Sequence, residues 1–164
     1  MILELRDLFL GGKKSVSQQY ELDLSKINFT GIYPFQRPIQ VTTQIENQAG
    51  VIRLTADVVF DFFHPCDRCT KQVVKLCHYL FQHTLVTFLN DDLSDEYVLV
   101  ENYQIDLDKL LREDILLRIP SKVLCDPSCK GLCPKCGKDL NEGECNCDFH
   151  SVDPRLEALR NLID

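Results

Sequence analysis

The cysteines of the C-terminal third constrain this chain more than any other feature. Six of the nine cysteines in the 164-residue sequence lie in a short stretch without regular apolar periodicity. Their spacing is Cys125-x3-Cys129-x3-Cys133-x2-Cys136-x8-Cys145-x-Cys147. So short an irregular segment buries too little apolar surface to order itself. A bound metal would then supply much of its folding free energy.

Residues 133–137, with the sequence C-P-K-C-G, have the form of a zinc knuckle. Two cysteines three positions apart can direct both thiolates at one ion, and the glycine after them lets the chain turn back. Zinc binds four thiolates tetrahedrally at about 2.3 Å, so two more ligands are needed. The predicted structural Zn²⁺ site consists of Cys133, Cys136, Cys145 and Cys147. Because four thiolates close the coordination shell, this metal is not expected to be catalytic.

Other ligand sets remain open at this point. Cys125 and Cys129 could displace Cys145 or Cys147, and His150 is a possible nitrogen ligand. The spacing indicates a metal more strongly than it indicates which four residues bind it.

A second pair, Cys66 and Cys69, lies at the tip between two predicted strands. It could form half of a second four-thiolate site completed by Cys125 and Cys129, it could be a redox dithiol, or its sulfurs could simply pack under a turn. His64 beside this tip is a weak third-ligand candidate, whereas Cys77 is expected in the core.

The N-terminal part reads as strands. Residues 39–45 and 52–62 alternate apolar and polar side chains, and the turn-forming residues 47–50 between them predict a hairpin. Residues 73–89 are β-prone on both faces, and residues 97–101 form a short strand.

The helices are expected later in the chain. Asp106 can cap a helix whose apolar residues recur at helical spacing until Pro120 stops it. An acidic turn is expected at residues 90–96, and a final helix begins at Asp153-Pro154.

These patterns predict an α+β protein in two parts. Residues 1–122 would form an antiparallel β-rich domain with one helix near 106–118. Residues 123–164 would form a cysteine-rich zinc-binding segment and a terminal helix, packed on the first part.

Composition narrows the class of protein. No apolar run approaches the roughly 20 residues that span a bilayer, and the first residues lack the features of a secretory signal. We therefore expect a cytoplasmic protein without a membrane partner, in which so many cysteines serve a metal or redox role. Phosphate-binding loops, catalytic serine elbows and H-E-x-x-H motifs are absent from the sequence, so neither an enzyme nor a small-molecule substrate is expected.

The charge is unevenly spread. The net charge is −7, and residues 91–118 hold nine of the acids and three of the bases. Because Lys and Arg supply most non-specific affinity for nucleic acid, any RNA contact must use a local basic patch. An acidic face at residues 91–118 would suit a basic protein partner at least as well as RNA.

Several motifs resemble one bacterial family. They are Cys66-Asp67-Arg68-Cys69, Ile105-Asp106-Leu107, the stretch 129–141 with the sequence C-K-G-L-C-P-K-C-G-K-D-L-N, and the ending Asp153-Pro154-Arg155-Leu156. In this order they resemble the YceD family of large ribosomal RNA subunit accumulation proteins, in the branch with a C-terminal cysteine-rich module. The resemblance implies a role in 23S ribosomal RNA accumulation or processing, with no established enzymatic reaction.

On this basis we expect a non-enzymatic factor that binds ribosomal RNA or a ribosomal protein of the large subunit. The candidate contacts are basic residues beside the hairpin tip and on the zinc module: Arg68, Lys71, Lys75, Lys130, Lys135 and Lys138. The alternative is a redox-responsive zinc-thiolate protein, in which oxidation of the C-terminal cysteines expels the metal.

Overall fold

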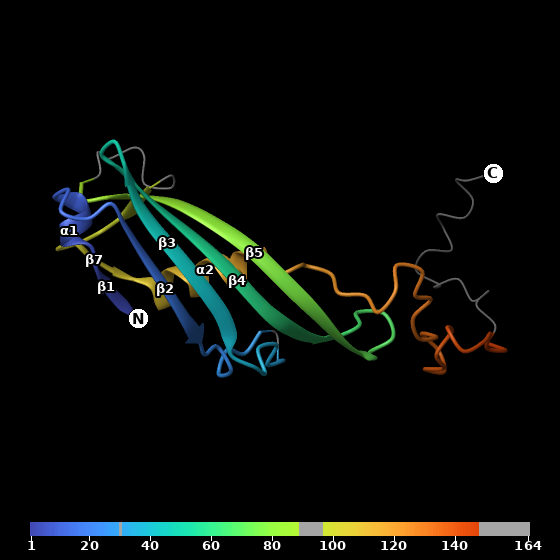
Figure 1. Ribbon diagram of the computed structural model, residues 1–164. Coiled ribbons are helices and arrows are strands. Elements are labelled where there is room, and N and C mark those ends of the chain that lie inside the picture. The colour runs from blue at the N-terminus through green and yellow to red at the C-terminus, as the bar shows by residue number, and fades with distance from the viewer. Residues whose placement is uncertain (30, 89–96, 148–164) are drawn as a thin grey trace, which may run out of the picture.

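The structure is a computed structural model that describes residues 1–29, 31–88 and 97–147 (Figure 1). Its elements are β1 (Ile2–Glu4), α1 (Arg6–Phe9), β2 (Ser15–Leu22), β3 (Ile39–Gln48), β4 (Val51–Pro65), β5 (Gln72–Val86), β6 (Tyr97–Leu99), β7 (Gln104–Asp106) and α2 (Leu107–Arg118). Strands thus dominate the described residues and the helices are short. The predicted α+β class with a β-rich N-terminal part is confirmed.

One long curved sheet carries the fold (Figure 1). Its strand order is β2-β3-β4-β5-β6, and β1 pairs with β7 in a separate two-stranded sheet. Neighbours in the large sheet are antiparallel except β5 and β6, which are parallel. The predicted hairpin is β3–β4, closed at Ala49 and Gly50, which both have positive φ.

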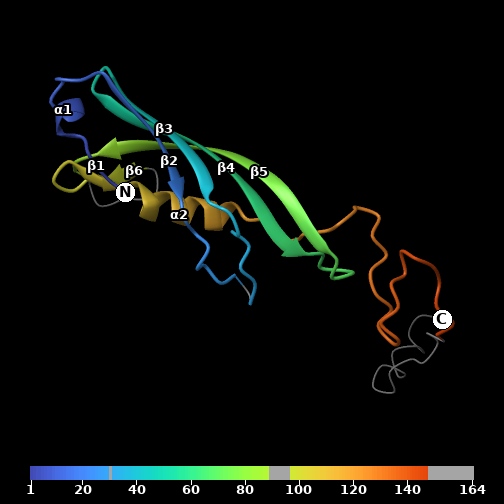
Figure 2. The ribbon, with the colours of Figure 1, turned by 60° about the horizontal axis from the view of Figure 1, so that its bottom comes forward.

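The alternation of side chains gives the sheet one buried and one exposed face. Buried positions follow period two along β3 and β4, because successive side chains of a strand point to opposite faces. The buried face packs on α2 through Leu111 and Ile115, both fully enclosed. At the other end of the sheet, residues of α1, Ile105 and Leu107 complete a second cluster. Figure 2 shows α2 running along this one side of the sheet.

Helix α2 begins where the sequence predicts. The carboxylate of Asp106 accepts hydrogen bonds from the backbone N–H groups of Asp108 and Lys109, the arrangement of an N-cap. The helix ends at Arg118, just before Pro120. Its capping residue and its stop were therefore both predicted correctly.

The β4–β5 hairpin extends beyond the other strands. β3 pairs with β4 as far as Val59, whereas β4 continues to Pro65 with β5 as its strand partner. The cysteine-rich tail lies at the end of this projection, far from α1 (Figures 1 and 2). This hairpin therefore carries the Cys66–Cys69 turn away from the main core.

Several elements differ from the sequence-based expectation. Strands β1, β2 and β7 and helix α1 were not predicted, because they are short or lack a clean apolar alternation. The long strand runs over Gln72–Val86 rather than 73–89, and β6 ends at Leu99. The expected acidic turn at 90–96 and the helix from Asp153 lie outside the described residues. The boundary at residues 122 and 123 stays a prediction.

Candidate metal centre

The structure brings eight cysteines into two groups of four. The members are Cys66, Cys69, Cys125 and Cys129 in the inner cluster, and Cys133, Cys136, Cys145 and Cys147 in the outer cluster. Within each group all four sulfurs lie within 4.8 Å of one another, and each group could hold a metal ion. Among the described residues, no further group of three or more potential ligands meets this condition.

The inner cluster joins two distant parts of the chain. The β4–β5 turn supplies Cys66 and Cys69, which lie 3.9 Å from Cys129 and 3.5 Å from Cys125, respectively, between sulfurs. In the turn, the Thr70 N–H donates to the Cys66 carbonyl and Thr70 has positive φ. This tight turn directs both thiols toward the tail.

The interior of this joint consists largely of sulfur. Cys66, Cys69 and Cys129 are buried, and only partly buried apolar side chains pack around them: Val73, Leu124 and Leu132. So small an apolar cluster gives little hydrophobic stabilisation at about 25 cal/mol per Å². A bond between these sulfurs and a metal would therefore contribute much of the stability of the joint.

The outer cluster is more open. Cys133 is buried, Cys136 is exposed, and Cys145 and Cys147 are half-buried. The Gly137 N–H donates to the Cys133 carbonyl at 2.9 Å with positive φ at the glycine, which is the turn that the C-P-K-C-G pattern predicts. The sulfurs of all four predicted ligands converge.

The protonation of the inner cluster favours a bound cation. Burial of the Cys66 thiol opposes ionisation, but backbone N–H groups of Cys125, Arg68 and Cys69 directed at the sulfur lower its pKa to about 6. By contrast, the neighbouring thiols of Cys69 and Cys129 raise the pKa of Cys125 to about 12. Four close thiolates repel one another, and a divalent ion among them removes that repulsion.

The outer cluster has the same electrostatic pattern. The N–H of Cys136, with that of Lys135, lowers the pKa of the Cys133 thiol to about 6. The thiol of Cys136 raises the pKa of Cys147 to about 12. The raised pKa of Cys125 and of Cys147 reflects crowding of four sulfurs, and a divalent ion among them would favour the thiolate of each; both donor sets therefore fit a thiolate-binding metal.

Backbone contacts fasten the tail to the hairpin tip beside the sulfurs. The Arg68 side chain donates to the Cys129 carbonyl at 2.6 Å, and the Leu132 N–H donates to the Arg68 carbonyl at 3.0 Å. Asp67 and Val123 exchange two bonds, from the Asp67 N–H to the Val123 carbonyl and from the Val123 N–H to the Asp67 carboxylate. The tip thus contacts the tail on both sides of the inner cluster.

The outer part of the tail has its own attachment. The Lys71 ammonium lies 2.9 Å from a carboxylate oxygen of Asp139 and 3.3 Å from one of Glu142. These two carboxylates raise the pKa of Lys71, and Lys71 in turn lowers the pKa of Asp139. Asn141 links the two clusters by donating its side-chain amide to the Cys129 sulfur at 3.5 Å.

The six basic residues predicted to contact RNA or a protein have different environments. Arg68 and Lys71 make the intramolecular contacts just described, and Lys138 donates to the Glu144 carbonyl at 2.7 Å. Lys75, Lys130 and Lys135 are exposed. Their proposed role in binding stays a prediction.

Of the remaining candidates, His64 and Cys77 lie outside both clusters. His64 stacks on Phe62, and its Nδ1 lies 2.7 Å from the Pro65 carbonyl oxygen. Cys77 is buried in the main core, as expected. His150, the possible nitrogen ligand, is outside the described residues.

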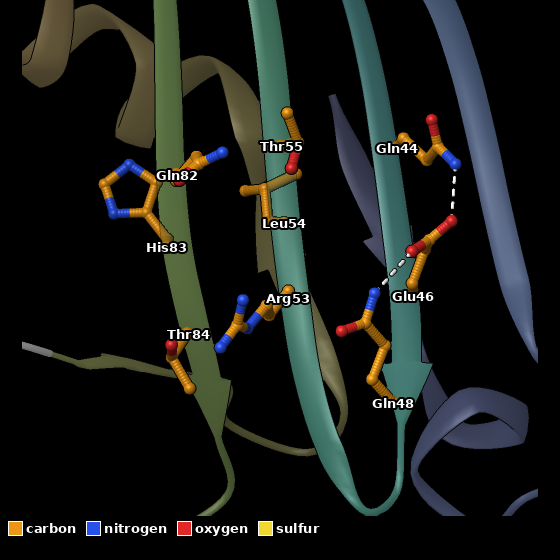
Figure 3. Close-up of a pocket in the computed structure, with 9 residues that line it drawn as sticks. All are labelled: Gln44, Glu46, Gln48, Arg53, Leu54, Thr55, Gln82, His83 and Thr84. Atoms are coloured by element: carbon orange, nitrogen blue, oxygen red, sulfur yellow. Dashed lines mark hydrogen bonds between the residues drawn. The ribbon is translucent and has the colours of Figure 1, made fainter.

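A polar hollow of about 520 Å³ lies on the exposed face of the sheet (Figure 3). Gln44 and Gln48 both donate to the Glu46 carboxylate, and Arg53 lies on the neighbouring strand. Its other lining residues are Leu54, Thr55, Gln82, His83 and Thr84. Apart from ordinary polar alternation, no sequence pattern predicts this hollow. One carboxylate among amides and hydroxyls does not form a metal site or a catalytic pair.

The fold and the site define a class of protein. It is a β-rich protein in which cysteines of a C-terminal tail meet cysteines of a hairpin tip. The chain belongs to the YceD family: the family model described as "Large ribosomal RNA subunit accumulation protein YceD" matches residues 54–163. The match includes both cysteine clusters. The resemblance noted from the sequence motifs is confirmed.

Individual relatives agree with this assignment. The chain is 27% identical over 160 residues to large ribosomal RNA subunit accumulation protein YCED homolog 1, chloroplastic, of Arabidopsis thaliana, covering 79% of this chain and 50% of that protein. It is 34% identical over 105 residues to the uncharacterized protein YlbN of Bacillus subtilis, covering 63% of this chain and 55% of that one. The chain thus spans about half the length of these curated relatives.

An uncharacterized protein of Mycobacterium tuberculosis is 33% identical over 130 residues, covering 76% of this chain and 62% of its own length. No solved structure matches the chain significantly. Among the described residues, no helix combines the length and apolar character needed to cross a membrane.

Replacing Gly131 by alanine should weaken the joint between tip and tail. Gly131 has φ of +78°, and a Cβ added there would lie 3.0 Å from the Arg68 carbonyl oxygen, the acceptor of the Leu132 N–H. We expect Gly131→Ala to speed amide hydrogen exchange at Leu132 at least tenfold, because each 1.4 kcal/mol lost in closing the joint is a factor of about 10.

Gly137→Ala is the matched control. It has similar strain, at φ of +73°, but open space around the added Cβ. Its effect at Leu132 should be much smaller. Equal effects of the two substitutions would show that backbone strain alone, and not the close approach to Arg68, accounts for the change.

Proposed function

We propose that this chain is a non-enzymatic factor in large ribosomal subunit biogenesis, acting in the accumulation or processing of 23S ribosomal RNA. Membership of the YceD family carries this proposal, since the family description and the name of the Arabidopsis relative both refer to large ribosomal RNA subunit accumulation. The described residues support a binding role, because their metal-ligand clusters are closed sets of four thiols.

The proposed partner is ribosomal RNA or a ribosomal protein of the large subunit. The tip of the β4–β5 hairpin and the tail together form the proposed contact surface, with Lys75 and Lys130 as its exposed cations. Arg68 and Lys71 serve first to hold tip and tail together, through their bonds to Cys129 and Asp139. We therefore assign the contact with a partner mainly to Lys75 and Lys130, with the exposed Lys135 and Lys138 as further candidates.

We also propose that both clusters bind Zn²⁺ and that its role is structural. Soft thiolate donors favour zinc over the hard divalent cations, and four thiolates leave no position for substrate. In the inner cluster, zinc would be bound by residues of the hairpin tip and the tail. In the outer cluster, it would order residues 133–147, whose described apolar burial is small.

A redox-responsive role is a second candidate, favoured by the difference in exposure between the clusters. Cys136 is exposed and Cys145 and Cys147 are half-buried, whereas three of the four inner cysteines are buried. Exposed thiolates are oxidised faster than buried ones. Oxidation of the outer cluster to disulfides would release its metal and leave the inner joint intact.

Deleting the gene for this chain should lower the cellular ratio of large-subunit to small-subunit rRNA. The expected decrease is about twofold or more, because large-subunit rRNA would fail to accumulate while small-subunit rRNA would not be affected. Quantitative northern blotting measures this ratio, and plasmid-borne wild-type protein should restore it. An unchanged ratio in the deletion strain would contradict the proposed function.

The double substitution Lys75→Glu and Lys130→Glu should weaken binding to large-subunit rRNA and reduce its salt dependence. The slope of log K against log salt concentration is negative, and each lost phosphate contact reduces its magnitude by about 0.7–0.9. Electrophoretic mobility shifts across a salt series measure this slope.

The control variant, Lys14→Glu with Lys109→Glu, changes the net charge equally at exposed positions away from the tip. It should keep the wild-type slope. If both variants lose affinity equally, then overall charge and not the tip and tail determines binding. If neither does, these residues do not contact RNA.

Protein purified without chelator should contain two zinc ions per chain. Cys66→Ser and Cys147→Ser should each lose about one zinc, measured by elemental analysis, whereas Cys77→Ser in the main core should retain both. Iron in place of zinc, or a single metal unaffected by Cys66→Ser, would contradict the assignment. If the redox role is correct, mild peroxide should release about one zinc per chain, from the outer cluster. If it is not, peroxide should not release the zinc of one cluster before that of the other.

A further inference from the structure

Strand β5 forms an open edge of the large sheet. It pairs with β4 over Gln72–Leu85, but on its other side β6 pairs only with Thr84–Val86. Within the described part of the chain, no strand pairs with residues 72–83 on that side. At about 3.3 Å per residue, this edge is roughly 40 Å long. Figures 1 and 2 show β5 as the outermost long strand, opposite β2.

This edge lacks the usual protection against strand pairing. Edge strands are commonly shielded by charged side chains, proline or bulges. Between residues 72 and 83 the one formally charged residue is Lys75. Val74, Leu76 and Leu80 lie on the same exposed face, with 54%, 69% and 55% of their surface exposed. The edge is therefore long, unpaired and apolar.

Apolar surface continues on the other side of the edge. Leu117 of α2 is 85% exposed and lines an open hollow that it shares with Leu80, Phe81 and His83 of β5. A strand added along β5 would thus find apolar contacts both on the exposed face of the sheet and beside α2. This arrangement suits an extended backbone with apolar side chains on both faces.

The charges beside the edge are already balanced. His78 lies 2.9 Å from Asp57, and His83 lies 2.8 Å from Asp114. Asp61, across from Leu76, is bonded to Arg37. Lys75 is the one formally charged residue between residues 72 and 83, and a single cation does not select a strongly acidic peptide. The complementary partner is a strand that is itself nearly neutral and apolar.

We propose that the strand that pairs with β5 is β5 of a second copy of this chain, aligned antiparallel about a two-fold axis at Cys77. In this register Val74 faces Leu80 of the other copy, and Lys75 faces Tyr79. Val74 and Leu80 then form apolar pairs, Leu76 faces His78 of the other copy, and the lysine meets an aromatic ring instead of a like charge.

The same register fits the position of β6. With the axis at Cys77, residues 72–82 of one copy pair with residues 82–72 of the other, so the shared ladder ends before Thr84, where β6 begins to pair. An axis one residue further along would place Gln72 against Thr84 and compete with β6. The two five-stranded sheets then join through their β5 edges.

The double substitution Leu76→Lys and Leu80→Lys tests this interface. Each substituted position is paired with an acid of β4, position 76 with Asp61 and position 80 with Asp57. The single chain should therefore tolerate the change. In a dimer the substituted positions of the two copies would lie on one face as diagonal neighbours, 76 beside 76 and 76 beside 80, so their like charges would repel one another. Sedimentation equilibrium should give twice the 18.9 kDa chain mass for the wild type and 18.9 kDa for the variant.

The matched control is Ile2→Lys with Leu10→Lys. These apolar residues are 69% and 68% exposed and lie away from β5, so the variant gains the same charge and loses similar exposed apolar surface. It should remain a dimer. A monomeric wild type, or a dimer that persists in Leu76→Lys with Leu80→Lys, would overturn the proposal.

Amide hydrogen exchange identifies the occupant independently of the variants. In the wild type, protection of the outward-facing amides of residues 72–82 should increase with protein concentration, because the second copy provides it. Protection that is complete in a monomer at every dilution would show that another segment of the same chain covers the edge. That result would also overturn the dimer, whatever the outcome for ribosomal RNA.

Discussion

The arrangement of the tail depends on the convergence of Cys66 and Cys69 with Cys125 and Cys129. Around these sulfurs the described apolar packing is slight, and the backbone bonds between tip and tail are few. Ordering the tail costs conformational entropy, and these contacts alone are too few to offset that cost. A metal bound by four thiolates would provide the missing stabilisation at one point, and the contacts of Arg68, Lys71 and Gly131 would then fix the orientation.

The long sheet determines where this joint lies. Because β4 and β5 continue past the last residue of β3 that pairs with them, the turn that holds Cys66 is displaced from the main core. The two large apolar clusters are covered by α2 and α1, and of the cysteines only Cys77 belongs to them. The apolar core of the sheet and the eight clustered cysteines are therefore carried by different residues of one chain.

How much the sequence revealed depended on the range of each signal. Local patterns predicted the β3–β4 hairpin, the Asp106 cap and the outer cluster, since neighbouring residues determine each of them. The inner cluster remained one of three interpretations, because sequence separation hides that Cys66 and Cys129, 63 positions apart, share a site. Strand β2 was missed because Gln18 interrupts the apolar positions Val16, Tyr20 and Leu22 on its inward face. The ion pairs of Lys71 with Asp139 and Glu142 were also not predicted, because they depend on how the tail folds back onto the hairpin tip.

The attachment of the tail at two points has a kinetic consequence. The chain leaves α2 at Arg118 beneath the sheet, and it meets the hairpin tip again at Val123, only five residues later. If the inner joint opened, the covalent tether would keep the tail within a few nanometres of its docking place, at a local concentration in the millimolar range. Reclosure would then be unimolecular and as fast in dilute as in crowded solution, so that the tail behaves as a hinged flap and not as a dissociable subunit.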